Sequence, residues 1–468
     1  YKRQADFGVG FDHYHSTHSD ENRQLAESIY ERLKTAGAIS AKTIQQLYDP
    51  LKEMFLPDRY IKGECPKCGT ADQYGDNCEN CGAAYSPTDL KNPKSVVSGA
   101  TPVMRDSEHY FFELGQFQGF LAEWLQGATI HPSIKAKLKE WFEAGLKAWD
   151  ISRDAPYFGF AIPRVEGKYF YVWLDAPIGY IASFKAYCAK RGMDFESFWT
   201  AGAEQTTELH HFIGKDIVNF HGLFWPAMLQ GSGHRTPTAL HVNGYLTVNG
   251  AKMSKSRGTF IKARTYLEHL PPEALRYYFA ARLGAGPDDL DLSFEDYVAR
   301  INSDLVGKFV NIASRCAGFL GQYFEGALSD GESVEPIYRL RNLSPILSGM
   351  YERGDYSFVV REVMLAADDV NSFIAQAAPW TLVKDPTMRQ SLHWICTNAI
   401  QMFRLLTIYL KPILPEVAKQ VEQFLRIKPL EWKDSLTLLP AGHRIGSYEH
   451  LFKRIETRSI DAVIEASK

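Results

Sequence analysis

The sequence predicts an α/β protein in which an insertion bearing cysteines interrupts a parallel sheet and a bundle of α-helices follows. Three observations lead to this prediction. Between residues 150 and 250, apolar strand-like runs each precede a polar loop and a helical pattern, which is typical of parallel strands. Residues 35–150 instead carry many prolines and four closely spaced cysteines. From residue 301 onward, apolar residues recur every three or four positions, which favours bundled helices.

Composition and charge narrow the class of protein. A chain of 468 residues is long enough for several domains, and its 45% hydrophobic and 23% charged residues are ordinary for globular proteins. The net charge of -3 argues against a uniformly basic nucleic-acid-binding protein but allows local basic patches. No apolar run approaches the length of a membrane span and the first residues do not resemble a secretion signal, so we expect a soluble cytoplasmic protein without membrane contact.

The first predicted helix follows Ser19. This residue is suited to cap a helix that ends before Gly37, and the apolar stripe of the helix comprises Leu25, Ile29 and Leu33. Three histidines just before it, His13, His15 and His18, have an alternative interpretation as metal ligands. We disfavour that alternative because no cysteine or carboxylate is spaced to complete the shell of ligands.

Residues 35–150 are predicted to form an inserted module of short strands and turns that ends in a helix around residues 134–148. It contains two Cys-x-x-Cys pairs, Cys65 with Cys68 and Cys78 with Cys81. Each pair can turn two thiolates toward one point, and a glycine after each pair allows the tight turn. Four thiolates complete a tetrahedral shell, so we predict one structural zinc ion. Disulfides or free thiols are less favoured alternatives in a chain without a secretion signal.

Three runs in the following part are predicted to be strands of the parallel sheet: residues 169–174, 210–214 and 239–242. Ligands of open α/β sheets bind beyond the carboxyl ends of the strands. We therefore expect the aromatic and polar residues that follow these runs to converge on one crevice.

A fourth strand, over residues 246–248, leads through an Asn-Gly turn into the stretch Lys252-Met253-Ser254-Lys255-Ser256. A helical pattern opens just after residue 260. Lysine ammonium and serine hydroxyl groups on such a loop suit a polyphosphate, because a compact positive charge can follow the charge that develops on a phosphoryl group. On composition alone, a solvated surface loop is an equally good interpretation.

Residues 301–468 are predicted to be helical. The first helix carries the apolar stripe Leu305, Phe309, Ile312, Cys316 and Phe319, and further helices are expected over residues 356–376 and around residues 394–409. Asn311 and Arg315 lie one turn apart on the flank of the first stripe, and Trp380 follows the second helix. Amide, arginine and aromatic side chains can bind unstacked RNA bases, although a tryptophan at this place is more often a cap on a helical core.

Residues 252–256 are identical to the KMSKS signature of class I aminoacyl-tRNA synthetases. With the cysteine module, this signature indicates a resemblance to the methionyl-tRNA synthetase family, and the resemblance covers nearly the whole chain. The resemblance implies a Rossmann-like class I fold that forms methionyl-adenylate from L-methionine and ATP with Mg²⁺, then transfers methionine to tRNA(Met). In the family the KMSKS loop closes over ATP. The resemblance assigns catalytic roles to Lys252 and Lys255, and ATP contacts to Ser254 and Lys255.

The resemblance also assigns binding residues elsewhere in the chain. The methionine pocket would be lined by Trp173, Ala176, Pro177, Tyr180, Phe220, His221 and Trp225. Aromatic walls suit a thioether through sulfur–aromatic contacts, although Trp225 by itself fits an ordinary core equally well. Gly214 and Asp216 would approach the adenosine ribose, and Arg153 would lie near the active site. The anticodon would be bound by Asn311, Arg315, Pro379 and Trp380.

By this resemblance the chain has five parts. They are residues 1–34 as a remnant of the first half of the nucleotide-binding fold, 35–150 as a connective insertion, 151–250 as the second half, 251–300 as the KMSKS loop and stem-contact region, and 301–468 as the anticodon-binding domain. The family's HIGH motif is not found in the sequence, which opens on Tyr1 in mid-pattern. We therefore expect that segment to be missing and the chain alone to be inactive. Without the family's appended dimerising domain, we expect a monomer.

Three alternatives stay open. A leucyl, valyl or cysteinyl synthetase would share the signature, but this sequence has no large editing insertion. A non-catalytic, zinc-containing tRNA-binding fragment would keep the cysteines and the bundle without needing the two lysines. A nucleotidyltransferase that adenylates a small acid would explain the loop but not the bundle.

Overall fold

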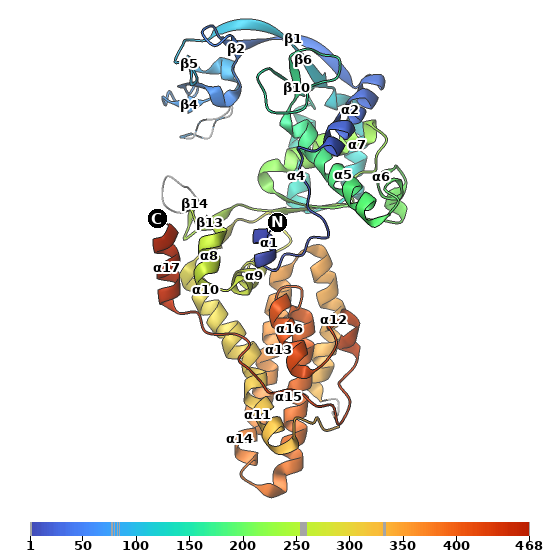
Figure 1. The fold of residues 1–468 in the computed structure, drawn as a ribbon, viewed down its shortest axis with the longest axis vertical. Helices are drawn as coiled ribbons and strands as arrows, with labels where there is room; N and C mark the ends of the chain where they lie inside the picture. Colours follow the sequence, from blue (N-terminus) through green and yellow to red (C-terminus); the bar gives the residue numbers. More distant parts are fainter. Residues whose placement is uncertain are drawn as a thin grey trace. The chain divides into compact units, whose positions relative to one another are not determined.

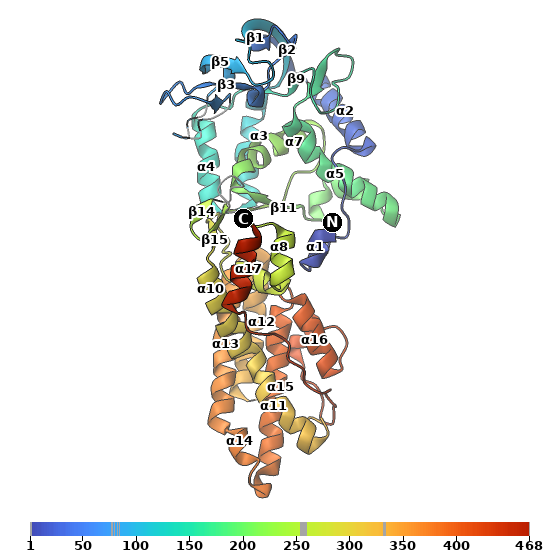
Figure 2. The same ribbon diagram turned by 60° about the vertical axis from the view of Figure 1, so that its left-hand side comes forward.

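The computed structural model describes residues 2–75, 78, 80, 81, 83, 85–252, 260–330 and 334–467. The chain divides into two compact units. The first unit comprises Tyr1–Phe11, Phe212–Lys215 and His241–Lys468, and the second comprises Asp12–His211 and Asp216–Leu240. Figures 1 and 2 label their helices and strands in two views.

Helix α2 (Asp20–Thr35) of the second unit is the helix predicted after Ser19. The Ser19 hydroxyl accepts a hydrogen bond from the backbone N–H of Asn22 at 3.2 Å, which caps the helix as expected. The predicted stripe of α2 is buried, and the helix packs beside α5 (Val172–Arg191) (Figure 1). The capping residue and the apolar spacing were therefore sufficient to predict α2.

Two antiparallel sheets fill the module that carries the cysteines. The larger sheet has the order β2-β1-β6-β8, and its elements are β1 (Ile39–Asp49), β2 (Met54–Phe55), β6 (Val103–Phe112) and β8 (Trp149–Asp150). The smaller sheet has the order β4-β3-β5, with β3 (Ile61–Glu64), β4 (Gln73–Tyr74) and β5 (Lys91–Ser95). The predicted helix is α4 (Pro132–Glu143), which stops short of residue 148 because Gly145 adopts a positive φ of 80°.

The predicted strand over residues 169–174 is wrong beyond Phe170. The chain forms β10 (Lys168–Phe170), which pairs antiparallel with β9 (Ser152–Asp154), and then enters α5 at Val172. The other predicted strands are confirmed as β11 (His210–Gly214) and β12 (Ala239–Asn243), which form a sheet of order β11-β12-β7. Strand β12 is parallel to β7 (Thr129–Ile130), so the expected parallel pairing is present, but β10 does not belong to this sheet.

Helical segments make up much of the rest of the second unit. They are α3 (Gln118–Gly127), α6 (Glu196–Trp199), the 3-10 turn η5 (Lys215–Ile217) that bridges to β11, the π-helical η6 (Phe220–Phe224) and α7 (Trp225–Gly231). Of these, η5 begins at Lys215 of the first unit. Segment η6 runs directly into α7, and five of the seven residues of α7 are buried. This continuous segment places aromatic residues on the interior of the unit.

In the first unit, the predicted strand over residues 246–248 is β13 (Leu246–Val248). It pairs antiparallel with β14 (Ala251–Lys252) and parallel with β15 (Leu290–Leu292). The helical pattern predicted after residue 260 begins as α8 (Ala263–His269), and α9 (Pro272–Ala280) and α10 (Phe294–Arg300) follow.

Four long helices of the first unit lie side by side in both views: α11 (Val310–Phe324), α12 (Glu335–Arg353), α13 (Tyr356–Ala377) and α15 (Arg389–Leu410) (Figures 1 and 2). The stripe predicted for the first helix starts in the π-helical η7 (Ile301–Phe309); its first four members are buried, and Phe319 is half-buried. The chain ends with α16 (Pro415–Leu425) and α17 (Thr457–Ser467). No described helix combines the length and apolar character that crossing a bilayer requires.

Candidate active site

Side chains from three segments of the second unit meet in what we call the aromatic–histidine cluster. Helix α5 contributes Trp173 and Tyr180, strand β11 contributes His211, and the η6–α7 segment contributes Phe220, His221 and Trp225. Ring contacts or hydrogen bonds join each member to at least one other.

One wall of the cluster is a stacked aromatic pair. The rings of Trp173 and Phe220 lie 4.3 Å apart at an interplanar angle of 10°. Trp149 packs against the same segment, with its ring 4.3 Å from that of Phe224. Because Phe220 and Phe224 belong to a π-helix, whose wider turns occur often at functional sites, the local backbone geometry supports a binding role for this wall.

A second wall is held by a hydrogen bond between Tyr180 and His221. The Nδ1 atom of His221 lies 3.0 Å from the carbonyl oxygen of Ile217, which can only accept, so Nδ1 carries the proton. Burial lowers the pKa of His221, which keeps the imidazole neutral and leaves Nε2 as an acceptor. The Tyr180 hydroxyl therefore donates to Nε2 across 2.8 Å.

The floor of the cluster pairs Trp225 with His211. The indole N–H of Trp225 donates to Nε2 of His211 at 3.1 Å, and Trp225 is only 1% exposed. Burial lowers the pKa of His211 to about 3, and the neighbouring His221 and His210 act in the same direction. His211 is thus a neutral acceptor at physiological pH.

The first turns of α5 also position the two small residues predicted for this site. Pro177 is buried inside the helix and Ala176 beside it is half-buried. The amide of Asn22 donates to the backbone carbonyl of Asp175 at 3.2 Å and so fixes this part of α5 to α2. Burial raises the pKa of the Asp175 carboxyl to about 7, so the side chain loses charge readily near neutral pH.

Together these contacts make a site that is lined by polarisable aromatic rings and carries few charges. Exposure falls from 39% at Tyr180 to 1% at Trp225, so the cluster reaches solvent at Tyr180 and is buried at Trp225. Aromatic rings and neutral histidines can contact a polarisable, uncharged side chain while excluding water. All seven residues predicted to line a methionine pocket come from the segments that build this cluster.

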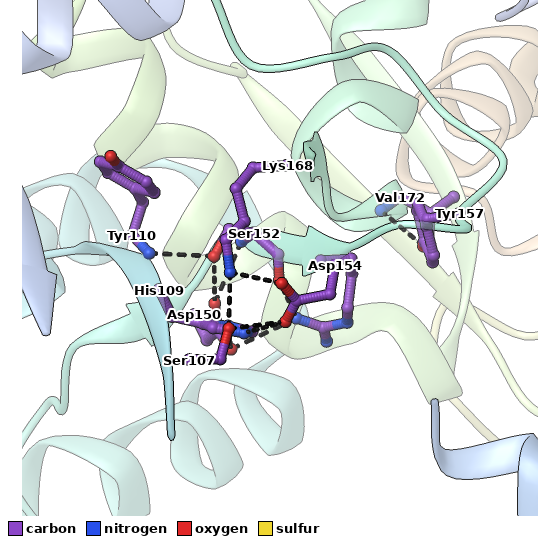
Figure 3. Close-up of polar contacts among 10 residues, drawn as sticks. Ser107, His109, Tyr110, Asp150, Ser152, Asp154, Tyr157, Lys168 and Val172 are labelled. Atoms are coloured by element: carbon purple, nitrogen blue, oxygen red, sulfur yellow. Dashed lines mark hydrogen bonds and ion pairs between the residues drawn. The ribbon is translucent and has the colours of Figure 1, made fainter. Parts of the chain in front are cut away.

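Arg153, predicted near the active site, is held on β9 of the same unit. Its guanidinium lies over the ring of Tyr171, with Cζ 3.8 Å from the ring centroid, and one nitrogen is 3.4 Å from Asp150. Asp150 in turn belongs to a polar network around the buried His109 (Figure 3). The contacts with the Tyr171 ring and the Asp150 carboxylate together restrict the direction in which the guanidinium points.

At the centre of this network, His109 has no exposed surface. Its two ring nitrogens lie 2.7 Å from Asp150 and 2.9 Å from Asp154, while Ser107 and Lys168 complete the shell of Asp154 (Figure 3). Burial disfavours the charged imidazole, yet the hydrogen bonds that His109 donates to both carboxylates raise its pKa overall. The ammonium of Lys168 and the raised pKa of His109 both offset the negative charge of the two carboxylates.

Sequence reasoning missed His109 and its partners. A usable signal exists in hindsight: Ser107 and His109 on β6 are spaced by two, and so are Ser152 and Asp154 on β9, so each pair points to one face of its strand. The partner strands, however, lie more than forty residues apart, and no local pattern joins them.

The four predicted zinc ligands come together. Their sulfur atoms all lie within 4.8 Å of one another, with Cys65 3.8 Å from Cys81 and Cys68 3.6 Å from Cys78. In each pair the backbone N–H of the second cysteine points at the sulfur of the first at 3.4 Å. Gly69 adopts a φ of 75°, as the tight turn requires, whereas Gly82 lies outside the described residues.

The residues predicted at the bundle end also meet, in the first unit. The guanidinium Cζ of Arg315 on α11 lies 4.6 Å from the ring centroid of Trp380 on α14 (Pro379–Leu382). Asn311 donates to the side chain of Asn371 at 3.4 Å. Trp380 is 39% exposed while Pro379 is buried, so the ring is not a closed cap on the core.

A family model for class I tRNA synthetases (M) matches residues 1–317, which is more than half of the chain. A second model, for the anticodon binding domain of methionyl tRNA ligase, matches residues 360–465. The chain belongs to the methionyl-tRNA synthetase family. It is accordingly a class I aminoacyl-tRNA synthetase with catalytic and anticodon-binding parts.

Relatives in the methionyl-tRNA synthetase family are similar along almost the whole chain. A methionine–tRNA ligase of Thiobacillus denitrificans is 58% identical over 466 residues, and one of Xanthomonas campestris pv. campestris is 59% identical over 469 aligned residues. Each alignment covers 99% of this chain and 67% of the relative. The chain thus spans about two thirds of the length of these proteins.

Solved structures of the family share the fold. The Mycobacterium tuberculosis methionyl-tRNA synthetase bound by methionyl-adenylate superposes with a TM-score of 0.77 at 22% identity, covering 97% of this chain and 85% of that one. Its apo form gives a TM-score of 0.74 at 20% identity. The predicted class, an α/β protein of class I synthetase type with a helical domain after it, is confirmed.

The residues predicted to contact ATP are only partly described by the structure. Gly214 ends strand β11, and Asp216 is exposed in the 3-10 turn that follows. Ser254 and Lys255 lie outside the described residues, as does the side chain of Lys252 at the end of β14. The ATP contacts predicted for these positions remain predictions.

Proposed function

We propose that this synthetase activates L-methionine with ATP and Mg²⁺ and transfers the methionyl group to tRNA(Met). The observation that carries the proposal is the aromatic–histidine cluster in a chain of this family. Its soft, nearly uncharged interior suits a thioether better than it suits a polar or branched side chain. The carboxylate oxygen of methionine attacks the α-phosphorus of ATP, and the bond from that phosphorus to pyrophosphate breaks, so no protein nucleophile is needed.

In the proposed complex, each wall of the cluster has a separate task. Trp173 and Phe220 cover the methionine side chain, while Ala176 and Pro177 leave room for it. The Tyr180–His221 pair presents polar atoms in fixed directions, and Trp225 closes the buried end. Catalysis by such a site is positioning together with charge stabilisation, with Mg²⁺ supplied on the phosphates of ATP.

ATP binding is proposed for Gly214 and Asp216 and for residues of the KMSKS loop. Gly214 leaves space for the adenosine, and the carboxylate of Asp216 can accept two hydrogen bonds from the ribose hydroxyls. Lys252, Ser254 and Lys255 would contact the phosphates, with Lys255 steadying the triphosphate during adenylation. Arg153, held between Tyr171 and Asp150 in the second unit, is the further residue proposed for the vicinity of the active site.

The anticodon is proposed to bind at the end of the helical bundle. Arg315 over Trp380 offers a cation and a half-open ring face to an unstacked base, and Asn311 one turn away offers amide hydrogen bonds to a base edge. Pro379 fixes the backbone on which Trp380 stands. Their residue types and proximity support this role.

We also propose one structural zinc ion on the four cysteines. Four thiolates fill a tetrahedral shell without leaving a position for water, so the ion would stabilise the module and take no part in adenylation. Replacing Cys65 with serine should abolish tightly bound zinc, measured by metal analysis of natively purified protein. The matched control is Cys188→Ala, which changes a buried cysteine outside the cluster. Equal zinc in both variants, or none in the unchanged protein, would contradict the proposal.

Three further proposals concern the chain as a whole. We keep the division at residues 34, 150, 250 and 300, a cytoplasmic location and a monomeric state. The alternative function is that of a zinc-containing tRNA-binding fragment that does not form the adenylate.

The test of the proposed function is ATP–pyrophosphate exchange with methionine, leucine or cysteine as the amino acid. We expect exchange with methionine only, on protein whose N-terminus has been checked by intact mass. Lys255→Ala should slow exchange with little change in methionine affinity, whereas Lys262→Ala, an exposed lysine a few residues away, should have no effect. Exchange with leucine or cysteine in place of methionine would overturn the substrate. No exchange with retained tRNA binding would support the alternative.

A further inference from the structure

His211 occupies the centre of the aromatic–histidine cluster, although the predicted methionine-binding residues do not include it. Its ring lies 4.8 Å from the ring of Tyr180 and 5.7 Å from that of His221, and its Nε2 accepts the indole N–H of Trp225 at 3.1 Å. His211 itself is 6% exposed. The side chain therefore contacts three of the residues proposed to hold methionine.

The hydrogen bond to Trp225 fixes the protonation state of His211. An indole nitrogen can only donate, so Nε2 of His211 must be unprotonated and the single proton of the neutral ring lies on Nδ1. Without this acceptor, the indole N–H of Trp225 would be buried and unpaired. A buried donor that loses its partner costs its full desolvation free energy, so the indole would turn or the pocket would admit water.

The two histidines of the cluster act in parallel. Each is neutral, and each accepts through Nε2 a hydrogen bond from an aromatic residue: His221 from Tyr180 and His211 from Trp225. The rings of Tyr180 and Trp225 contact one another at 6.2 Å, with a T-shaped geometry. The orientation of the Tyr180 and Trp225 rings thus depends on both histidine acceptors.

We propose that His211 is a positioning residue for methionine binding: by accepting the indole N–H of Trp225 and backing the ring of Tyr180, it sets the shape of the pocket before methionine arrives. The inference rests on the proposed function, because the ligand it serves is methionine. His211 does not touch the reacting atoms. It acts through Trp225 and Tyr180, and a pocket held in its bound shape loses less conformational freedom on binding.

Replacement of the acceptor tests the proposal. His211→Leu keeps an apolar side chain at the position but removes the acceptor, and we expect methionine affinity to weaken about ten-fold, as one orphaned buried donor implies. The KM for methionine should rise in ATP–pyrophosphate exchange while the KM for ATP and the maximal rate change little. His211→Gln, whose amide oxygen can accept the same hydrogen bond, should restore most of the affinity.

The adjacent residue provides a matched control. His210 lies next to His211 on β11, but its ring nitrogen is paired with exposed Glu208 at 2.9 Å. His210→Leu makes the same chemical change one position away, and we expect methionine affinity to stay as in the unchanged protein.

A direct probe of the hydrogen bond does not depend on activity. In protein labelled with ¹⁵N-indole tryptophan, the Trp225 signal is identified by its loss in Trp225→Phe. We expect this signal to exchange slowly with water in the unchanged protein and in His211→Gln, and to shift and exchange faster in His211→Leu. In the Trp225→Phe background, which has no donor, His211→Leu should add less than a two-fold further loss of methionine affinity.

The outcomes separate the inference from the proposed function. If calorimetry detects no methionine binding to the unchanged protein, the proposed function fails, and the indole signal still decides whether His211 holds Trp225. If methionine binds but His211→Leu binds it equally well, or the glutamine variant is as weak as the leucine variant, the positioning role is wrong.

Discussion

The aromatic–histidine cluster of the second unit and the Arg315–Trp380 pair of the first use aromatic rings in opposite ways. In the cluster, Trp225 is 1% exposed and its only polar atom is paired with a neutral histidine. At the bundle end, Trp380 is 39% exposed and its ring faces a positive charge at 4.6 Å. One ring is part of the folded interior, and the other is presented to solvent.

This difference teaches how each site can discriminate. A buried wall fixed by hydrogen bonds recognises the shape and softness of a small ligand, because any misfit leaves a cavity or an orphaned donor. An exposed ring beside an arginine recognises any flat base that stacks on it, and its affinity depends on salt. Changes to the fully buried residues of the first site should therefore affect folding and methionine binding together, whereas changes at the second site should affect mainly tRNA binding.

The largest difference is expected in stability. Trp225→Ala removes a fully buried ring and should lower the free energy of unfolding by about 3 to 5 kcal/mol. Trp380→Ala removes a partly exposed ring and should lower it by about 0.5 kcal/mol or less. Urea unfolding of both variants, followed by circular dichroism, measures the contrast. Equal losses would mean that Trp380 is a core residue after all.

The reverse contrast is expected in RNA binding. Trp380→Ala should weaken tRNA(Met) binding by about 1 to 3 kcal/mol through lost base stacking, with methionine-dependent exchange unchanged. Filter-binding titrations at two salt concentrations measure the effect. Trp394→Phe, a conservative change nearby on α15, serves as the control. Unaltered tRNA affinity in the Trp380 variant would remove the bundle end from the anticodon site.

Acid should weaken the pocket through His211. Its pKa is about 3 in the folded protein, against about 6.5 for a free histidine, so the unfolded chain binds more protons between these values. The stability that neutral His211 contributes is present above pH 6.5 and is lost as the pH falls toward 3. At pH 5 the loss is about 2 kcal/mol.

Comparison with His211→Gln isolates this contribution, because glutamine does not titrate. Between pH 7 and pH 5 the unchanged protein should lose about 2 kcal/mol more unfolding free energy than the variant. Parallel losses in both proteins would show that His211 is not a buried neutral group. The groups that face His211 are His221, His210 and Tyr180, and they are the same in both proteins.

The smallest effect is expected for the hydroxyl of Tyr180. Tyr180→Phe removes one hydrogen bond to His221 but keeps the ring, and it should weaken methionine affinity by about 1 kcal/mol. Calorimetric titration with methionine measures the change. Phe184→Tyr, a change of the same size one turn further along α5, is the control. A loss as large as that expected for Trp225→Ala would give the hydroxyl a direct role with the ligand.

Elements with a clear period or a local cap could be predicted from sequence. The spacing of apolar residues was sufficient for α2, α13 and α15, and the Cys-x-x-Cys pairs predicted a cluster that the structure confirms. The KMSKS spelling identified the family, which the comparisons confirm. Such signals are local, so no knowledge of tertiary contacts is needed to interpret them.

The start of α5 could not be predicted because its signals conflict. An aromatic and β-branched run ends at Leu174, and Pro177 follows, which together resemble a buried strand and a loop. The chain instead enters the helix at Val172 and accommodates the proline inside it. Short apolar runs fit either structure, and tertiary packing against α2 decides between them here.

His109 and His211 show a second limit of prediction from sequence. His109 and His211 owe their properties to partners 14 to 45 positions away in sequence, and neither belongs to a recognisable motif. The seven residues predicted for the pocket came from resemblance to the family, which carries over residues that touch the ligand. Residues that orient those side chains become visible only when the fold brings them together.

The assignment of the aromatic–histidine cluster to methionine is tested most directly by calorimetric titration of the protein with methionine and with leucine. We predict that methionine binds and that leucine, which has no thioether and branches at Cγ, binds at least about ten-fold more weakly. Trp173→Ala should lose most of the methionine affinity while retaining its fold. Equal binding of both amino acids, or methionine affinity that survives the loss of Trp173, would contradict a methionine pocket at this place.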